Sequence, residues 1–74
     1  MRIAGCDLGA ASVGFAIATI GEDGKITFED TRYALHDGDP MGLFQAWYRD
    51  NDVASCAALA ATGVYADELS SPVL

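Results

Sequence analysis

The residues best suited to chemistry lie together near the start of the sequence, in residues 5–12 (GCDLGAAS). One carboxylate, Asp7, ends an apolar run, and one hydroxyl, Ser12, opens the next. The side chains between them are mostly small, which allows backbone N–H groups to approach an anion closely. A carboxylate beside such a loop can hold a cation next to that anion. The pattern therefore predicts a loop that receives a phosphate group or a hydrated metal ion.

Length and charge limit the classes of function. The chain has 74 residues, 51% of them hydrophobic, and a formal net charge of −7. A chain of this length forms at most one small domain. Its four basic residues are scattered, so we expect no nucleic-acid partner, because phosphate backbones are bound by basic patches. We see neither a secretory signal nor an apolar run that could span a bilayer, and we expect a cytoplasmic protein without membrane contact.

The two cysteines do not form a recognisable metal motif. Cys6 and Cys56 both lie in apolar runs, without metal-ligand spacing. We expect two buried, reduced thiols, with a disulfide or a ligand role as the alternatives.

Three strands are predicted to position the loop. Residues 3–7 form a short apolar run, and residues 13–20 are apolar or small on both alternating faces, which predicts a strand covered on both sides. Residues 21–24 (GEDG) form a turn sequence typical of a hairpin. Residues 25–35 begin with alternating polar and apolar side chains, which predicts a half-exposed strand near a sheet edge.

A helix should follow the third strand. Asp39 is a natural N-cap and Pro40 a natural first helical residue, so we expect a helix from Pro40 to about Arg49. Its apolar side chains recur at intervals of four residues and would form a stripe against the sheet. These side chains are Leu43, Phe44, Trp47 and Tyr48.

The next apolar run is ambiguous by itself. Residues 53–59 permit a strand or a helix, but a short apolar run after a helix and before Thr62-Gly63 favours a strand that returns to the sheet parallel to the first. The loop of residues 61–64 would then open at the same sheet edge as residues 7–12. The predicted order is β-β-β-α-β in an α/β fold, with room for a short helix after Tyr65.

Polar residues in the turns have simpler interpretations. His36, beside acidic residues, is interpreted as solvated or turn-capping rather than as a catalytic base. Four further polar residues are interpreted as turn and cap residues: Asp37, Asp39, Asn51 and Asp52.

These segments resemble the start of the nucleotide-binding domain of the actin, sugar-kinase and heat-shock-chaperone ATPase superfamily. The resemblance rests on the pattern Gly5-x-Asp7-x-Gly9-x-x-Ser12, the hairpin, and the Ala-Thr-Gly loop of residues 61–63. Within that superfamily the chain looks most like the BadF-type ATPases that activate 2-hydroxyacyl-CoA dehydratases and benzoyl-CoA reductases. The resemblance implies a ribonuclease-H-like partial domain, with residues 1–74 as the N-terminal part of a longer actin-like domain.

The resemblance also assigns roles to residues. It implies ATP and Mg²⁺ as cofactors, with Asp7 as the catalytic residue that holds Mg²⁺ through water. It places the phosphates against two loops, whose contacting residues would be Gly9, Ala10, Ala11, Ser12, Thr62 and Gly63. It implies a dehydratase or reductase as partner protein and a homodimer of the full-length parent. The family's iron–sulfur cluster is not expected in this chain, because neither Cys6 nor Cys56 lies in a comparable motif.

The chain departs from the family pattern at several positions. Gly14 stands where many members carry a basic residue, and alanines at positions 10 and 11 stand where hydroxyl residues are common. The second phosphate loop and the adenosine loop are missing, so we expect the 74-residue chain alone to hydrolyse little or no ATP.

Two alternative functions stay open. Residues 7–16 also resemble the first motif of RuvC-like nuclease domains in CRISPR effectors, in which the aspartate is a direct ligand in a two-metal site. The third possibility is a structural or interaction fragment without chemistry.

Overall fold

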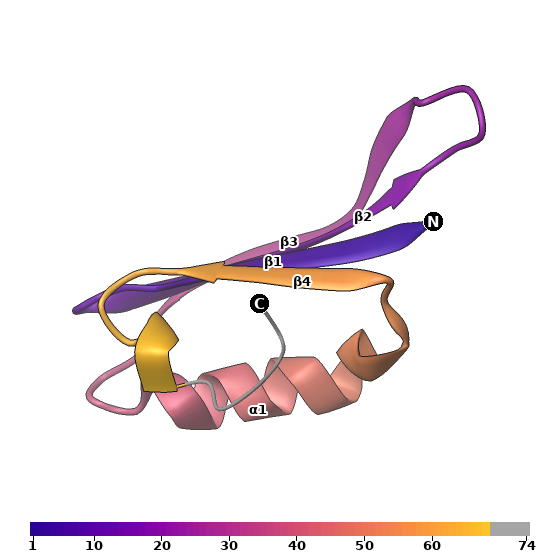
Figure 1. Cartoon of the computed structure of the whole chain (residues 1–74). Helices are drawn as coiled ribbons and strands as arrows, with labels where there is room; N and C mark the ends of the chain where they lie inside the picture. Colours follow the sequence, from indigo (N-terminus) through magenta and orange to yellow (C-terminus); the bar gives the residue numbers. More distant parts are fainter. Residues whose placement is uncertain (69–74) are drawn as a thin grey trace.

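The computed structural model describes residues 1–68 and shows a four-stranded sheet with one helix packed against one of its faces (Figure 1). The elements in chain order are β1 (Arg2–Leu8), β2 (Ser12–Ile20), β3 (Ile26–Leu35), α1 (Pro40–Asp50), a 3-10 turn η1 (Val53–Ser55), β4 (Ala58–Thr62) and a second 3-10 turn η2 (Ala66–Glu68). The predicted order β-β-β-α-β is confirmed. Of the predicted terminal helix after Tyr65, the described residues contain η2, and residues 69–74 lie outside them.

The strand order in the sheet is β3-β2-β1-β4. β2 pairs antiparallel with both β1 and β3, and β4 pairs parallel with β1, so that Asp7 lies opposite Thr62. β3 is an edge strand, as its alternating pattern predicted. Because β1 and β4 run in the same direction, the loops that follow them open at the same end of the sheet.

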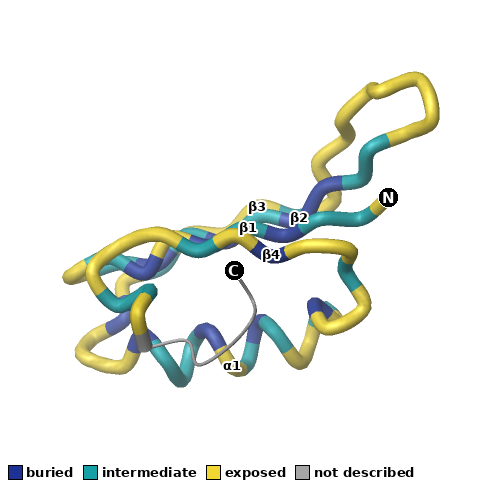
Figure 2. Tube along the Cα trace, in the orientation of Figure 1, coloured by how far each residue is buried: buried dark blue, intermediate teal, exposed yellow. Residues whose placement is uncertain are grey.

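The core lies between α1 and the sheet. Asp39 caps the helix by accepting a hydrogen bond from the Gly42 N–H at 3.0 Å. Trp47, 1% exposed, stacks on Phe15 of β2 with ring centroids 4.5 Å apart. The buried positions of α1 face the sheet (Figure 2), which confirms the predicted stripe. In residues 1–68 no helix has both the length and the apolar character needed to cross a membrane.

Helical cover lies on one face of the sheet only, within the described residues. The β2 side chains that face α1, Val13, Phe15 and Ile17, are buried, whereas Gly14 and Ala16 on the other face are half-buried. Ala18, at the register shift of this strand, is buried as well. Within residues 1–68 the predicted cover on both sides is therefore only partly confirmed, because no helix lies over the face of Gly14 and Ala16. The β2–β3 hairpin extends beyond the end of α1 (Figure 1), and its tip is exposed (Figure 2).

The fourth strand begins later than predicted. Residues 53–55 form η1, which follows Asp52 in a left-handed conformation (φ 51°). The Ser55 hydroxyl donates to the Asp52 carbonyl at 2.8 Å, and Val53 is buried against the core. Local hydrogen bonds of this kind compete with strand pairing. Pairing with β1 therefore starts only at Ala58, and the predicted strand over residues 53–59 is corrected to Ala58–Thr62.

Candidate functional site

The carboxyl ends of β1 and β4 meet closely at Gly63. A Cβ atom on Gly63 would lie 2.5 Å from the Leu8 carbonyl oxygen and 2.6 Å from the Asp7 Oδ1 atom, and the residue has a φ of +99°. Only glycine adopts this φ without strain and lacks the Cβ atom that would collide with Leu8 and Asp7. Just beyond it, the Tyr65 N–H donates to the Leu8 carbonyl at 3.0 Å. The structure therefore brings together the two loops that the sequence predicted to converge, with Asp7 between them.

The β1–β2 loop presents backbone donors to solvent. The Gly9 N–H donates to the Ser12 carbonyl at 2.9 Å, which closes the loop. Ala10 and Ala11 are exposed, and their N–H groups donate to no acceptor within residues 1–68. A pair of adjacent unpaired N–H groups on small residues is a suitable site for an anion.

Asp7 offers a carboxylate for a hydrated cation. It is exposed, and no side-chain donor among residues 1–68 is bonded to it. Nowhere in the described part of the chain do three or more histidine, cysteine, aspartate or glutamate residues gather as a metal site. Mg²⁺ commonly keeps several waters and binds through one or two carboxylates together with substrate phosphates. A single exposed carboxylate suits the role predicted for Asp7, which is to hold Mg²⁺ through water.

A hollow of about 500 Å³ lies beside Asp7 on the open face of the sheet. Its floor is formed by small residues of β1 and β2, among them Gly5, Gly14 and Ala16, and Tyr33 of β3 lines it as well. The hollow leaves the carboxylate accessible from the side of the sheet that α1 does not cover.

His36 belongs to this region, although its sequence context suggested a solvated residue. It is 6% exposed, so the solvated interpretation is wrong, while the turn-capping interpretation is confirmed because its Nδ1 accepts a hydrogen bond from the Gly38 N–H at 3.0 Å. Its Nε2 lies 3.0 Å from the Gly9 carbonyl oxygen. A hint was available in the sequence, since His36 directly follows the second strand of the predicted hairpin, and a hairpin brings that end back beside the start of its first strand.

Cys6 lies behind the site on the core face, where its thiol is buried. Burial, followed by the negative charge of Asp7, raises the pKa of the Cys6 thiol from 9.0 to about 11. The thiol therefore keeps its proton at neutral pH. Both cysteines are free, as predicted, but Cys56 is only half-buried.

No protein-family model matches the sequence, and no curated protein matches it. Solved structures from Aquifex aeolicus share the fold. A Ppx/GppA family member has a TM-score of 0.72 and 21% sequence identity over 92% of this chain and 29% of its own. A structure described as a PPX-GPPA enzyme has a TM-score of 0.71 and 20% sequence identity over 85% of this chain and 26% of its own. A type II variant described as a Ppx/GppA phosphatase has a TM-score of 0.71 and 21% sequence identity over 92% of this chain and 28% of its own.

The fold is the ribonuclease-H-like, actin-like fold, in partial form. At 20–21% identity the similarity establishes the fold alone, and it confirms the predicted fold class. The chain spans less than a third of the length of these structures.

Proposed function

We propose that this chain forms the first phosphate-binding part of an ATP-binding, ATP-hydrolysing domain. The observation that carries the proposal is the juxtaposition of an accessible carboxylate with unpaired backbone donors at the converging ends of β1 and β4. Asp7 would hold Mg²⁺ through water, and the N–H groups of Ala10 and Ala11 would donate to phosphate oxygens. Ser12, Thr62 and Gly63 are the remaining predicted contacts at this edge.

Each part of the site has a definite chemical task in this proposal. Bound Mg²⁺ supplies positive charge that neutralises the phosphates and stabilises charge that develops on them during hydrolysis. Asp7 orients the ion, and the absence of a side chain at Gly63 keeps the second loop close to that carboxylate. The net charge of −7 opposes an uncompensated polyanion, so nucleotide should bind only together with the cation.

The finer assignment is an activator of a CoA-ester dehydratase or reductase, as in the BadF-type ATPases. It is supported by the resemblance of residues 5–12 and 61–63 to that family. A second candidate is a phosphatase, favoured by the fold similarity to a protein described as a Ppx/GppA phosphatase. A two-metal nuclease would need several carboxylates beside Asp7, and residues 1–68 contain no group of three or more potential metal-ligating side chains.

The test compares Asp7→Asn with a matched charge change, Glu22→Gln, in the exposed hairpin turn. Millimolar MgATP or magnesium tripolyphosphate is titrated into the 74-residue chain, and the amide resonances of Ala10 and Ala11 are followed by NMR. We expect both ligands to shift these resonances in the wild type and in Glu22→Gln. Asp7→Asn should weaken binding by about tenfold or more, since groups that orient the ligands of a metal ion commonly contribute that much to its affinity.

Stability provides the control for folding. Because the Asp7 carboxylate faces water, Asp7→Asn should change the free energy of unfolding by less than about 0.5 kcal/mol. Wild-type amides that do not respond to either ligand would contradict the phosphate site. In a longer protein that carries these residues, hydrolysis of MgATP alone favours the activator, and hydrolysis of tripolyphosphate as well favours the phosphatase.

A further inference from the structure

We propose that His36 is a positioning residue for the phosphate loop, and that it acts as the neutral Nε2–H tautomer by fixing the direction of the Gly9–Ala10 peptide. The inference rests on the proposed function, because fixing the loop improves binding only if the loop receives phosphate. No sequence motif or fold similarity assigns this role to His36.

The contacts of the ring define its protonation state. The Gly38 N–H donates to Nδ1 at 3.0 Å, so Nδ1 carries no proton. Nε2 lies 3.0 Å from the Gly9 carbonyl oxygen, which can only accept, so Nε2 must carry the proton. Both nitrogens of this buried ring are satisfied in the Nε2–H tautomer and in no other form.

The turn after β3 is shaped to make the first contact. Asp37 and Gly38 have φ values of 49° and +85°, and this left-handed pair follows His36 directly and leaves the Gly38 N–H bonded to its ring. The His36 backbone N–H also donates to the Ala11 carbonyl at 3.1 Å. His36 therefore holds two carbonyls of the β1–β2 loop, those of Gly9 and Ala11, at the end of the sheet where the β3–α1 turn lies (Figure 1).

Holding the Gly9 carbonyl also sets the direction of a donor. In a planar trans peptide the C=O and the next N–H point in opposite directions. With the Gly9 carbonyl directed at His36, the Ala10 N–H points away from the ring. Ala10 is exposed and its N–H has no acceptor within residues 1–68, so the donor faces solvent. Without the ring contact this peptide is free to rotate, and the donor loses its fixed direction.

Only the neutral ring keeps both contacts. A proton on Nδ1 would face the Gly38 N–H, so a ring with protons on both nitrogens loses that contact. The Tyr65 ring meets His36 edge-on at 5.9 Å on the side of β4.

The first experiment is nitrogen NMR of the His36 ring in the wild-type chain, which needs neither ligand nor mutation. His36 is the only histidine in the sequence, so its ring signals are unambiguous. We expect the Nε2–H tautomer at about pH 8. A dominant Nδ1–H tautomer, or a rapidly exchanging mixture, would overturn the inference directly.

The second experiment separates the two contacts with matched variants. His36→Asn places an oxygen near the Nδ1 position and can keep the Gly38 contact, but it cannot reach the Gly9 carbonyl. His36→Gln can place an N–H near the Nε2 position and can keep the Gly9 contact. With magnesium tripolyphosphate as the probe, we expect His36→Asn to weaken binding by about tenfold, and His36→Gln to retain more of it.

Equal affinity of His36→Asn and wild type, or equal losses in His36→Asn and His36→Gln, would overturn the role of His36 while leaving the phosphate site intact. Absence of any response in the wild type would overturn the proposed function and this inference together.

Discussion

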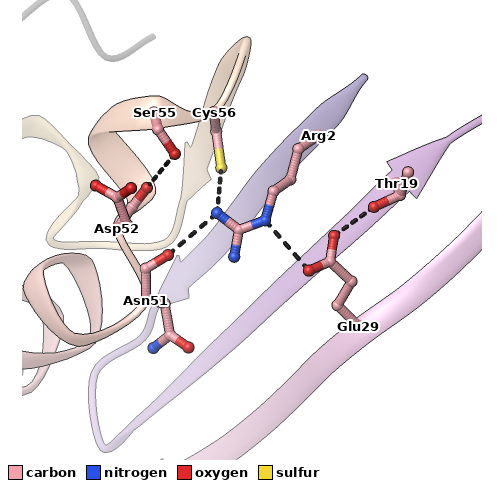
Figure 3. Close-up of polar contacts among 7 residues, drawn as sticks. All are labelled: Arg2, Thr19, Glu29, Asn51, Asp52, Ser55 and Cys56. Atoms are coloured by element: carbon pink, nitrogen blue, oxygen red, sulfur yellow. Dashed lines mark hydrogen bonds and ion pairs between the residues drawn. The ribbon is translucent and has the colours of Figure 1, made fainter.

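The two ends of β1 differ in how completely their polar groups are paired. At the amino end, the Arg2 guanidinium lies 3.2 Å from Glu29 Oε1 and donates to the Asn51 carbonyl at 3.2 Å and to Cys56 Sγ at 3.8 Å (Figure 3). Thr19 also donates to Glu29. The hydrogen bond from Thr19 has the largest effect in lowering the pKa of the Glu29 carboxyl, and the hydrogen bond from Arg2 lowers that pKa further. This end ties β1 to β3 and to the segment after α1.

At the carboxyl end the polar groups point outward. The Asp7 carboxylate and the N–H groups of Ala10 and Ala11 have no partner within residues 1–68. Exposed polar groups bonded to water cost the fold little, whereas paired groups are no longer available to a ligand. The comparison indicates that the amino end of β1 stabilises the domain and that the carboxyl end is available for binding.

The largest effect should come from a methyl group at the carboxyl end. Gly63→Ala places a Cβ against Leu8 and Asp7 at a φ of +99°, and we expect a loss of about 3 kcal/mol or more in the free energy of unfolding. The control is Gly24→Ala, which has a similar φ of +82° but no atom within 4 Å of the added Cβ. It should lose only about 1 kcal/mol, from backbone strain.

Urea denaturation of the two variants measures this difference. Similar losses for Gly63→Ala and Gly24→Ala would mean that the close approach of the second loop to Asp7 has no energetic consequence.

A second effect separates the cysteines, one of which lies near each end of β1. The unfolded chain releases the Cys6 proton near pH 9.0, whereas the folded chain keeps it up to about pH 11. The folded state therefore binds more protons in this window, and stability present below pH 9.0 is lost as the pH rises toward about 11. We expect a loss of about 2 kcal/mol from this group between about pH 8 and about pH 10.5.

Denaturation of wild type and Cys6→Ala at both pH values isolates the contribution of Cys6, since other groups also titrate there. Alkylation offers a simpler readout. At about pH 8, iodoacetamide should modify the half-buried Cys56 well before Cys6, as followed by mass spectrometry. Equal rates at the two thiols would contradict the burial of Cys6.

A smaller effect is expected at the amino end. Arg2→Met keeps the apolar stem of the side chain and removes its hydrogen bonds, with an expected loss of about 1 kcal/mol, because the ion pair with Glu29 is partly exposed to solvent. Arg49→Met, which removes the more exposed pair with Asp50, should change stability by less than about 0.5 kcal/mol.

Ligand titration sharpens this last prediction. Binding of magnesium tripolyphosphate should be unchanged in Arg2→Met, because Arg2 lies at the opposite end of β1 from the loop. A loss of affinity as large as that of Asp7→Asn would show that the two ends of the strand do not have separate roles.

Much of the architecture followed from local sequence patterns. The Asp-Gly turn, the Asp39-Pro40 helix start and the apolar stripe of α1 are fixed by contacts within a few residues, and the structure confirms each of them. The small residues of the β1–β2 loop likewise predicted exposed backbone donors. These features depend on the nearest neighbours in the chain, which the sequence displays directly.

Tertiary structure alone decided the features that depend on distant partners. The run from Val53 was ambiguous because alanine and valine suit several conformations, and pairing with β1 began only after the local bonds of η1 ended. His36 became buried because the β3–α1 turn folds onto a loop 27 residues earlier in the chain. Gly63 is required because the parallel pairing of β4 with β1 places it against Asp7. The residues next to Gly63 in the sequence do not show this contact.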